Sequence, residues 1–590
     1  MSKETKICQN CKNQFTIEPE DFGFYEKIKV PPPTWCPECR FKRRLNTMNI
    51  YSLYKRNCDL CGKDMITIYH KDCSFRVYCP KCWWNDKWDG TEYAQDYDPN
   101  RSFFEQLIEL RNKTPFMALE NQETTLVNTE YTNYSSNIKN SYLTYFADYA
   151  EDCCYLSVVH TVKNSADCYR IRESGMCYGS IGISKCYKAF FSEECDNCLD
   201  VYFCKNCSGC SNCFGCINLR KKSYCIFNQQ YTKDEYESFL KEAKLSSFTS
   251  VNSYSKKADT FWLSFPNKYY YGNSLNVNVS GNYVYESKNA KNSYMITNAE
   301  DAKYVQMLSV PSTKDSYDYT GWGDGAKLIY ECQSVGMSVS NVRFSMHCYP
   351  NIMNCDYSYY ANGCKNVFGC VNLKKKEYCI FNKQYSKEEY ENLKNRIIAD
   401  MAKNPYTDSM GKAWRYGEFF PNSISPFGYN ETIAMDYFPC TKEQALSSGF
   451  AWREIEKNQY APTIKSVDLP DNIEECGQKI LDEIIECSNC KRSFKIVRSE
   501  FDLLKNLNLP VPRQCPECRR KTRFTRVSLP RLFSRKCQCS GKTSDNQIYQ
   551  NTISHPHHQS NYCPNEFETS YASERKEIVY CEQCYQAEVV

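Results

Sequence analysis

The sequence has no apolar run that approaches the roughly 18 residues of a membrane-spanning helix, so we expect no membrane segment. It has only six histidines, and it lacks a Ser-His-Asp arrangement, a His-Glu-x-x-His pattern and a glycine-rich phosphate loop. Asp and Glu total 70, too many to single out a catalytic pair. These absences argue against an enzyme, and we nominate no catalytic residue.

Aliphatic residues are scarce as well. Hydrophobic residues make up 42% of the 590-residue chain, but this share includes 39 cysteines and 48 tyrosines, so the remainder is thin for ordinary large cores. The first ten residues, MSKETKICQN, contain no apolar stretch and no small-residue cleavage site, so we expect a cytoplasmic, reducing location. There, abundant cysteines are more often metal ligands or small buried side chains than disulfides.

Each end of the chain carries the same cysteine module. The ligand candidates are Cys8, Cys11, Cys36 and Cys39 near one end, and Cys487, Cys490, Cys515 and Cys518 near the other. In both modules a 24-residue stretch separates two Cys-x2-Cys knuckles, and the second knuckle reads Cys-Pro-Glu-Cys-Arg. Two such knuckles supply the four thiolates of a closed structural zinc site, which has no open position for catalysis. Iron in a rubredoxin-like site is the alternative, since four thiolates also suit it.

A second module follows each of these. The candidates after the first are Cys58, Cys61, Cys79 and Cys82, whose two knuckles are separated by the segment 62–78, a usual zinc-ribbon spacing. The predicted fourth site consists of Cys537, Cys539, Cys581 and Cys584. Its first knuckle is Cys-x-Cys, and its 41-residue gap contains His555, His557, His558 and Cys563, any of which could substitute. We therefore expect about four zinc sites, with the last ligand set open.

These motifs resemble a known domain family. The strings CQNCKNQF, CPECRFKRR, CSNCKRSF and CPECRRKTR are similar to those of a probable zinc-ribbon, or treble-clef-like, domain. The strings CFGCINLRKKSYCIFNQQYTKDEY and FFPNSISPFGYNETIAMDYFP resemble a family of cysteine-rich bacterial proteins with that domain at both ends. The resemblance covers nearly the whole chain, and it implies an architecture but no activity.

The middle of the chain is a duplicated repeat. The string CINLRKKSYCIFNQQYTKDEYESFL, which starts at Cys216, recurs as CVNLKKKEYCIFNKQYSKEEYENL from Cys370 onward, a 154-residue offset. Cysteines of the first copy recur every nine residues from Cys168 to Cys213, a period that is not helical. It indicates a parallel β-solenoid, in which two nonapeptides would make an 18-residue coil, although the hand and coil length stay open. Tyr169, Tyr178 and Tyr187 would then stack as an aromatic ladder.

The central cysteines are predicted to pack rather than bind metal. Under the 154-residue offset Cys213 meets Val367, Cys204 meets Ser358 and Cys207 meets Ala361, none of which can supply a thiolate. An iron-sulfur cluster is the alternative for the closely spaced cysteines between Cys204 and Cys216.

The predicted fold is mostly β and multi-domain, with tandem zinc-ribbon or treble-clef modules at both termini flanking two parallel β-solenoids. Capping boxes at Thr232 to Glu235 and Ser386 to Glu389 predict short helices that cap each solenoid, with Tyr236 and Tyr390 packing back. The expected segments are 1–90 (zinc modules), 91–127 (linker with a helix at 101–112), 128–245 and 246–403 (solenoid copies), 404–475 (extended connector with a helix near 441–448) and 476–590 (zinc modules).

Basic residues concentrate beside the second knuckles. From Cys487 to Lys536 there are fourteen Lys or Arg against three Asp or Glu, although the net charge of the chain is only +4. The candidate phosphate-contacting residues are Arg519, Arg520, Lys521, Arg523, Arg526, Arg531 and Arg535, with Arg40, Lys42, Arg43 and Arg44 as a smaller set near the N-terminus. Guanidinium geometry matches phosphate, so we expect a nucleic acid, RNA or DNA, as partner.

Three alternatives to a nucleic-acid- or ribosome-associated scaffold remain open. The solenoid faces could bind a protein partner, with the zinc modules only terminating the solenoids. The basic face could also be merely solvated, or meet an acidic patch on the rest of the chain. A carbohydrate-active enzyme is the third, because parallel β-helices host such activities, but the absences above argue against it.

Overall fold

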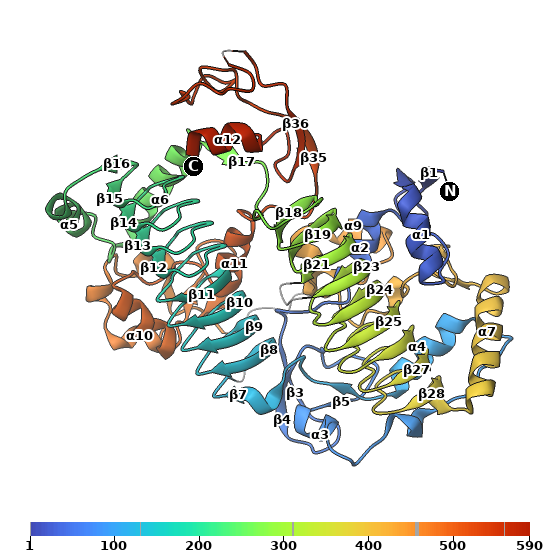
Figure 1. Cartoon of the computed structure of the whole chain (residues 1–590). Helices are drawn as coiled ribbons and strands as arrows, with labels where there is room; N and C mark the ends of the chain where they lie inside the picture. The colour runs from blue at the N-terminus through green and yellow to red at the C-terminus, as the bar shows by residue number, and fades with distance from the viewer. Residues whose placement is uncertain (1, 130, 309–311, 455–459, 560, 590) are drawn as a thin grey trace. The chain divides into compact units, whose positions relative to one another are not determined.

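The computed structural model describes residues 2–129, 131–308, 312–454, 460–559 and 561–589 (Figure 1). The chain divides into two compact units, each discontinuous in sequence. Unit 1 comprises Met1–Leu119, Tyr270–Glu454 and Pro530–Leu532, and unit 2 comprises Glu120–Tyr269, Ile455–Leu529 and Phe533–Val590. Each unit therefore contains one solenoid copy and two cysteine modules. Among the described residues, no helix combines the length and the apolar character needed to cross a membrane.

Both solenoids are stacks of parallel strands, as the sequence predicts. In unit 2 the stack runs through β7 (Leu126–Val127), β8 (Thr132–Lys139), β9 (Thr144–Glu151), β10 (Ser157–Lys163), β11 (Tyr169–Gly175), β12 (Tyr187–Phe190), β13 (Leu199–Tyr202), β14 (Ser211–Phe214) and β15 (Ser223–Ile226), and ends on the antiparallel β16 (Gln229–Gln230). In unit 1 it comprises β18 (Gly281–Tyr285), β19 (Lys288–Lys291), β20 (Ser293–Thr297), β21 (Ala299–Lys303), β22 (Gln306–Leu308), β23 (Thr313–Thr320), β24 (Ala326–Gln333), β25 (Val339–Arg343), β26 (Met353–Asp356), β27 (Lys365–Phe368) and β28 (Glu377–Ile380), and ends on the antiparallel β29 (Lys383–Gln384).

The coil is shorter than the sequence predicts. In unit 2 Ser157 pairs with Tyr169 and Leu199 with Ser211, so each turn of the solenoid is a 12-residue coil. In unit 1 the length varies between a 12-residue coil, as from Met353 to Lys365, and a 14-residue coil, as from Ala299 to Thr313. The prediction of an 18-residue coil is therefore wrong.

Each coil is built from three-residue sides. The backbone φ is positive at every third residue over long stretches, for example at Asn197, Asp200, Phe203 and Asn206. Such φ values are uncommon outside glycine, so their regular recurrence is the backbone signature of this coil. The residue after each of these is buried; examples are Cys198, Val201, Cys204 and Cys207. A residue nine positions later therefore lies in the next coil, displaced by one three-residue side, and it is again buried in the interior.

The aromatic ladder also differs from the prediction. Because neighbours in a column are one full coil apart, Tyr169, Tyr178 and Tyr187 do not stack on one another. The observed column in unit 2 is Tyr178, Phe190, Tyr202, Phe214 and Ile226, paired in parallel from coil to coil. Its side chains are buried, and they pack in one cluster with Tyr236, Trp262 and Phe501.

The predicted helices form. Helices α5 (Lys233–Glu242) and α7 (Lys387–Lys403) begin at Thr232 and Ser386 with complete capping boxes, and their Tyr236 and Tyr390 are buried. Helix α4 (Phe103–Lys113) buries Phe103, Phe104, Leu107 and Leu110, and α9 (Lys442–Ser447) begins at Thr441. Helix α6 (Phe248–Trp262) follows α5.

The described parts of the segment predicted as an extended connector, 404–454 and 460–475, are folded. Its part in unit 1 contains β30 (Tyr406–Thr407), β31 (Ala413–Trp414) and α8 (Ala434–Tyr437), in addition to α9. Trp414, Phe419 and Phe420 are buried in the core of that unit.

Candidate metal centres

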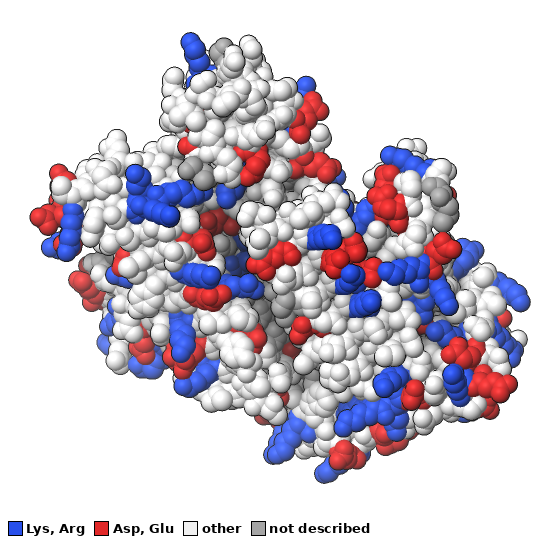
Figure 2. Space-filling view, viewed as in Figure 1, with Lys and Arg blue, Asp and Glu red and all other residues white. Residues whose placement is uncertain are grey.

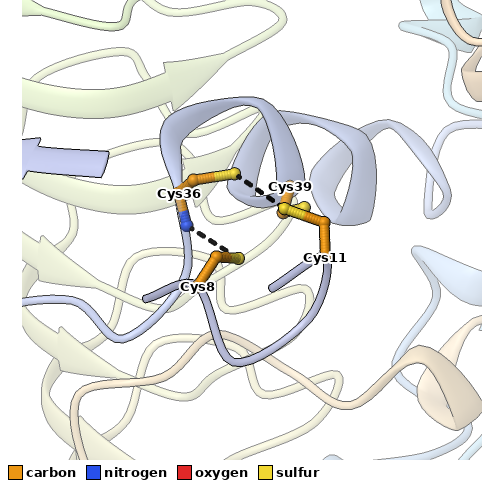
Figure 3. Close-up of side chains that lie close together, drawn as sticks. All are labelled: Cys8, Cys11, Cys36 and Cys39. Atoms are coloured by element: carbon orange, nitrogen blue, oxygen red, sulfur yellow. Dashed lines mark hydrogen bonds between the residues drawn. The ribbon is translucent and has the colours of Figure 1, made fainter. Parts of the chain in front are cut away.

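The first candidate centre lies between a β-hairpin and a helix (Figure 3). Strands β1 (Glu4–Ile7) and β2 (Gln14–Ile17) form the hairpin, whose turn carries Cys8 and Cys11. Cys36 caps α2 (Pro37–Leu45) and Cys39 lies in its first turn. The four Sγ atoms lie within 4.8 Å of one another, so the predicted residues do come together. The region between the knuckles contains α1 (Pro19–Lys27).

The same arrangement recurs in two further modules. Cys58 and Cys61 lie in the turn between β3 (Tyr54–Asn57) and β4 (Asp64–Thr67), while Cys79 and Cys82 lie between β5 (Val77–Tyr78) and α3 (Pro80–Trp83) or within α3. In unit 2, β33 (Ile485–Glu486), β34 (Ser493–Phe494), α10 (Arg498–Leu507) and α11 (Pro516–Phe524) hold Cys487, Cys490, Cys515 and Cys518. Each set of four Sγ atoms is equally compact.

Matching atoms are equally spaced in the three modules. The backbone N–H of the third cysteine donates to Sγ of the first over 3.2 Å in each: Cys36 to Cys8, Cys79 to Cys58 and Cys515 to Cys487. The Sγ atoms of the second and third cysteines lie 3.7, 4.0 and 3.7 Å apart. Four thiolates about 2.3 Å from a tetrahedral zinc ion would lie about 3.8 Å from one another. The sulfur positions therefore fit a metal ion, and they exclude disulfides, whose sulfurs are about 2.05 Å apart.

The fourth centre contains Cys563, one of the ligands that the sequence left open. The compact group is Cys537, Cys563, Cys581 and Cys584, so Cys563 takes the place of Cys539. Cys537 follows β35 (Phe533–Lys536) and Cys563 precedes β36 (Glu566–Thr569), while Cys581 follows β37 (Ile578–Tyr580) and Cys584 lies in α12 (Glu582–Val589). The Cys581 N–H donates to Cys537 Sγ over 3.2 Å, and Cys563 Sγ lies 3.8 Å from Cys581 Sγ, as in the other modules.

In each terminal module at least one thiol has a lowered pKa, while other thiols of the same cluster have raised ones. Burial alone would raise the pKa of Cys490, but hydrogen bonds from Arg492 and from the neighbouring thiols lower it to about 6. The backbone N–H of Lys63, together with the Cys82 thiol, lowers the pKa of Cys61 to about 7. Asn10 donates to Cys39 Sγ and Asn489 to Cys518 Sγ, which favours the thiolate, although the neighbouring thiols raise the pKa of Cys39 and burial raises that of Cys518.

Most of the central cysteines are buried thiols with a raised pKa, although hydrogen bonds from neighbouring thiols lower the pKa of Cys198, Cys210, Cys216 and Cys355. Burial raises the pKa of Cys177 and of Cys364 to about 12, and that of Cys168 well above its usual range. Interior thiols point at backbone carbonyls one coil on: Cys204 Sγ donates to Cys213 O and Cys216 Sγ to Cys225 O, each over 3.4 Å. These thiols fill the narrow solenoid core and satisfy carbonyl groups, which supports the packing interpretation.

The arginines beside the first module are buried in unit 1. Arg40, Arg43 and Arg44 on α2 are at most 2% exposed. Arg40 pairs with Asp318 on β23 over 2.8 Å, Arg43 reaches both Glu331 on β24 (2.7 Å) and Glu418 (2.8 Å), and Arg44 contacts Asp318 and Glu331 at 3.2 and 3.3 Å. The second-knuckle helix is thereby bound to the acidic outer side of the solenoid.

The third module repeats this contact in unit 2. Arg519 on α11 pairs with Asp167 of the solenoid and lies 2.9 Å from Glu500, while Arg523 lies 2.9 Å from Asp167. Burial opposes the charge of Arg519, but Asp167 and Glu500 raise its pKa well above its usual range. Arg526 pairs with Glu193 and Asp259.

These contacts correct part of the predicted nucleic-acid site. Arg40, Arg43, Arg44 and Arg519 are buried and form ion pairs with acidic side chains of the same chain, so they are not accessible to phosphate. For these four residues the structure agrees with the alternative in which the basic face meets an acidic patch on the rest of the chain. Of the other predicted residues, Lys42, Arg520, Arg523 and Arg535 are half-buried, and Lys521, Arg526 and Arg531 are exposed. Lys521 and Arg531 lie near Glu517 and Glu38. On the face drawn in Figure 2, basic side chains are interspersed with acidic ones.

Comparison with models of protein families, with curated proteins and with solved structures finds no match to this chain. The resemblance to zinc-ribbon proteins thus stays a prediction.

Proposed function

We propose that the protein is a non-enzymatic zinc-binding scaffold, in which metal folds the terminal modules and these dock onto the two solenoids. One observation supports this most directly: the helix that presents two cysteines of a metal centre also carries the arginines that bind the solenoid. In α2, Cys36 and Cys39 are followed by Arg40, and α11 repeats the order with Cys515, Cys518 and Arg519.

The physical link between metal and scaffold is the first turn of these helices. A zinc ion held by Cys36 and Cys39 would fix that turn, and with it the positions of the guanidinium groups that follow. A small module of this kind has little apolar core, so metal binding contributes directly to its folding free energy. Buried ion pairs often add little net stability over apolar contacts, but loss of one partner leaves an uncompensated charge. The arginines would therefore specify where each module docks.

The outer solenoid faces are the surface that we propose for a protein partner. Tyr187 and Leu199 are neighbours in successive coils, and both are about half exposed. Nucleic acid is the less favoured partner, because four of the proposed phosphate contacts are occupied internally.

The test combines chelation with hydrogen exchange on the full chain. Removal of metal by a strong chelator should abolish amide protection in residues 8–82 and 487–584, while the solenoid strands keep theirs. Terminal modules that stay protected without metal would overturn the proposal. Binding to RNA and DNA, measured at low and at physiological salt, separates the partners, since phosphate contacts give a steep salt dependence.

A further inference from the structure

The knuckle of the fourth module is interrupted by an insertion. In the second module Cys58 and Cys61 share the tight turn of a hairpin, and in the fourth module the corresponding Cys537 and Cys563 flank the inserted segment 538–562. The strand register on either side matches, because Asn57 pairs with Asp64 and Lys536 with Glu566. The insertion therefore leaves the first metal centre of this module intact.

The insertion brings a second set of donors to the same place. Cys539, His555 and His558 come from the insertion, and together with Cys584 they form a group whose donor atoms lie within 4.8 Å of one another. Cys539 Sγ lies 3.3 Å from His555 Nδ1, which lies 3.1 Å from His558 Nε2, and that atom lies 3.3 Å from Cys584 Sγ. All four residues are buried.

Neighbouring groups orient both imidazoles toward this cluster. His555 Nε2 lies 2.8 Å from Glu588 Oε1, and His558 Nδ1 lies 2.8 Å from the carbonyl oxygen of Asn561. Each ring can thus donate its N–H away from the cluster and turn its other nitrogen, an acceptor, inward. A metal-bound histidine almost always donates its second nitrogen to a carboxylate or carbonyl in this way.

The supporting groups are themselves held in place. Glu588 accepts hydrogen bonds from the Thr552 N–H (2.8 Å), the Thr552 hydroxyl (2.7 Å) and the Tyr549 hydroxyl (3.0 Å). Asn551 donates to Cys539 Sγ over 3.1 Å, and Asn565 donates to Cys581 Sγ over 3.3 Å. Cys539 and Cys581, one from each donor group that shares Cys584, therefore each accept a hydrogen bond.

We propose that this module holds two zinc ions joined by the Cys584 thiolate. One ion is bound by Cys537, Cys563, Cys581 and Cys584, and the other by Cys539, His555, His558 and Cys584. Sulfur keeps lone pairs after binding one metal, so a single thiolate can bridge two. The second site has four protein ligands and no open position, as in structural zinc sites. This proposal concerns an additional ion, and it does not depend on the scaffold function.

The competing arrangement is one ion with exchangeable ligands. His557 is exposed, and its Nε2 lies 3.4 Å from Cys584 Sγ and 3.6 Å from Cys563 Sγ. In the two-ion centre it serves only as a hydrogen-bond donor to these thiolates, which makes it the matched control for its neighbour His558.

Native mass spectrometry of the reduced, zinc-loaded full chain tests the proposal by counting ions. We expect five, one for each donor group described above. His558→Ala should lose one ion, and His557→Ala should lose none. A wild-type chain that holds only four ions although its other centres are filled would overturn the proposal. An unchanged number of ions in His558→Ala, or the loss of an ion in His557→Ala, would also overturn it. Absence of zinc from the Cys8 or Cys487 modules, checked with Cys36→Ser and Cys515→Ser, would instead count against the scaffold proposal.

A measurement on the wild-type chain covers the case in which a variant does not fold. In the cobalt-loaded protein a bridging thiolate couples the spins of two ions, so part of the paramagnetic resonance signal should be lost. Full signal from every bound cobalt ion would contradict the bridge.

Discussion

At the residue scale, the sequence identified the arginines but not their environment. Their spacing after the second knuckle is visible in CPECRFKRR and CPECRRKTR, and it fits phosphate as well as carboxylate. The partners of Arg43, by contrast, are Glu331 and Glu418, hundreds of residues away in sequence. No local pattern marks those carboxylates among 70 acidic residues, so only the fold could show that the guanidinium groups are occupied.

Loss of a buried arginine should destabilise the chain far more than loss of an exposed lysine on the same helix. Arg519→Met leaves Glu500 without its cation and Asp167 with Arg523 alone, so we expect the free energy of unfolding to fall by about 3–5 kcal/mol. Lys521→Met removes only an exposed pair with Glu517, and it should cost less than about 1 kcal/mol. Urea denaturation gives the free energy of unfolding of each variant, and hydrogen exchange of peptides from unit 2 shows where protection is lost. Equal losses in the two variants would count against internal docking.

Asp356 gives the chain a predictable response to acid. It is fully buried on β26, where Arg343 and Lys394 lie 2.8 and 2.7 Å from its carboxylate. Burial opposes its charge, but these cations hold its pKa below the ordinary 3.8. A carboxyl group with a lowered folded pKa stabilises the fold above the unfolded pKa, and this contribution is lost as pH falls toward the folded one.

The variant Asp356→Asn isolates this effect. The difference in free energy of unfolding between wild type and variant should be constant from about pH 7 to about pH 5 and shrink below about pH 4. Thermal unfolding of unit 1 at several pH values measures it. A difference that grows in acid would mean that the carboxyl is not stabilised as an anion.

At the element scale, the sequence predicted the solenoids and their capping helices but misjudged the coil. The nine-residue cysteine spacing is a multiple of the three-residue side, and it does not report the 12-residue turn. The three-residue side could not be recognised in the sequence, because its interior position accepts Cys, Ser, Ala, Val and Ile alike. The alternation of backbone φ is carried by residues as different as Asn206 and Phe203, so side-chain identity gives little signal for it.

Interior cysteines should be replaceable without loss of metal. Cys213 lies between Val201 and Cys225 in one interior column, and its counterpart in the second copy is Val367. Cys213→Val should leave the zinc content unchanged and alter the free energy of unfolding by less than about 1.5 kcal/mol, because volume and apolar character are nearly kept. Cys515→Ser, the matched change at a proposed ligand, should lose one zinc ion. Metal analysis of the two variants tests this prediction, and loss of metal in Cys213→Val would contradict the packing role of the central cysteines.

The fourth metal centre shows the same limit of local patterns. The sequence pointed to the right neighbourhood, with Cys563 and the three histidines all noted as candidates. The Cys-x-Cys string suggested that Cys537 and Cys539 share an ion, whereas the hairpin between β35 and β36 pairs Cys537 with Cys563. The signal that could have found this is the Cys-Pro-Asn-Glu-Phe string after the insertion, which precedes a strand as Cys61 does.

At the scale of the whole molecule, chain order does not predict which module goes with which solenoid. The first two modules belong to the unit of the second solenoid copy, and the last two to the unit of the first. Ion pairs of the same kind hold a module in each unit: α2 meets Asp318 and Glu331 in one copy, and α11 meets Asp167 in the other. Each unit can therefore finish folding only after segments that are far apart in the sequence have been synthesised.

The central claim is that metal resides in the terminal modules and that the cysteine-rich core contains none. The most direct test is the zinc and iron content of the full chain, purified without oxygen, together with its visible spectrum. The account predicts zinc in every terminal centre, five ions in all, with no iron and no visible absorbance. Iron or zinc that persists after the terminal cysteines are replaced would place metal in the solenoids and contradict the account. Iron that is lost together with those cysteines would contradict only the choice of zinc.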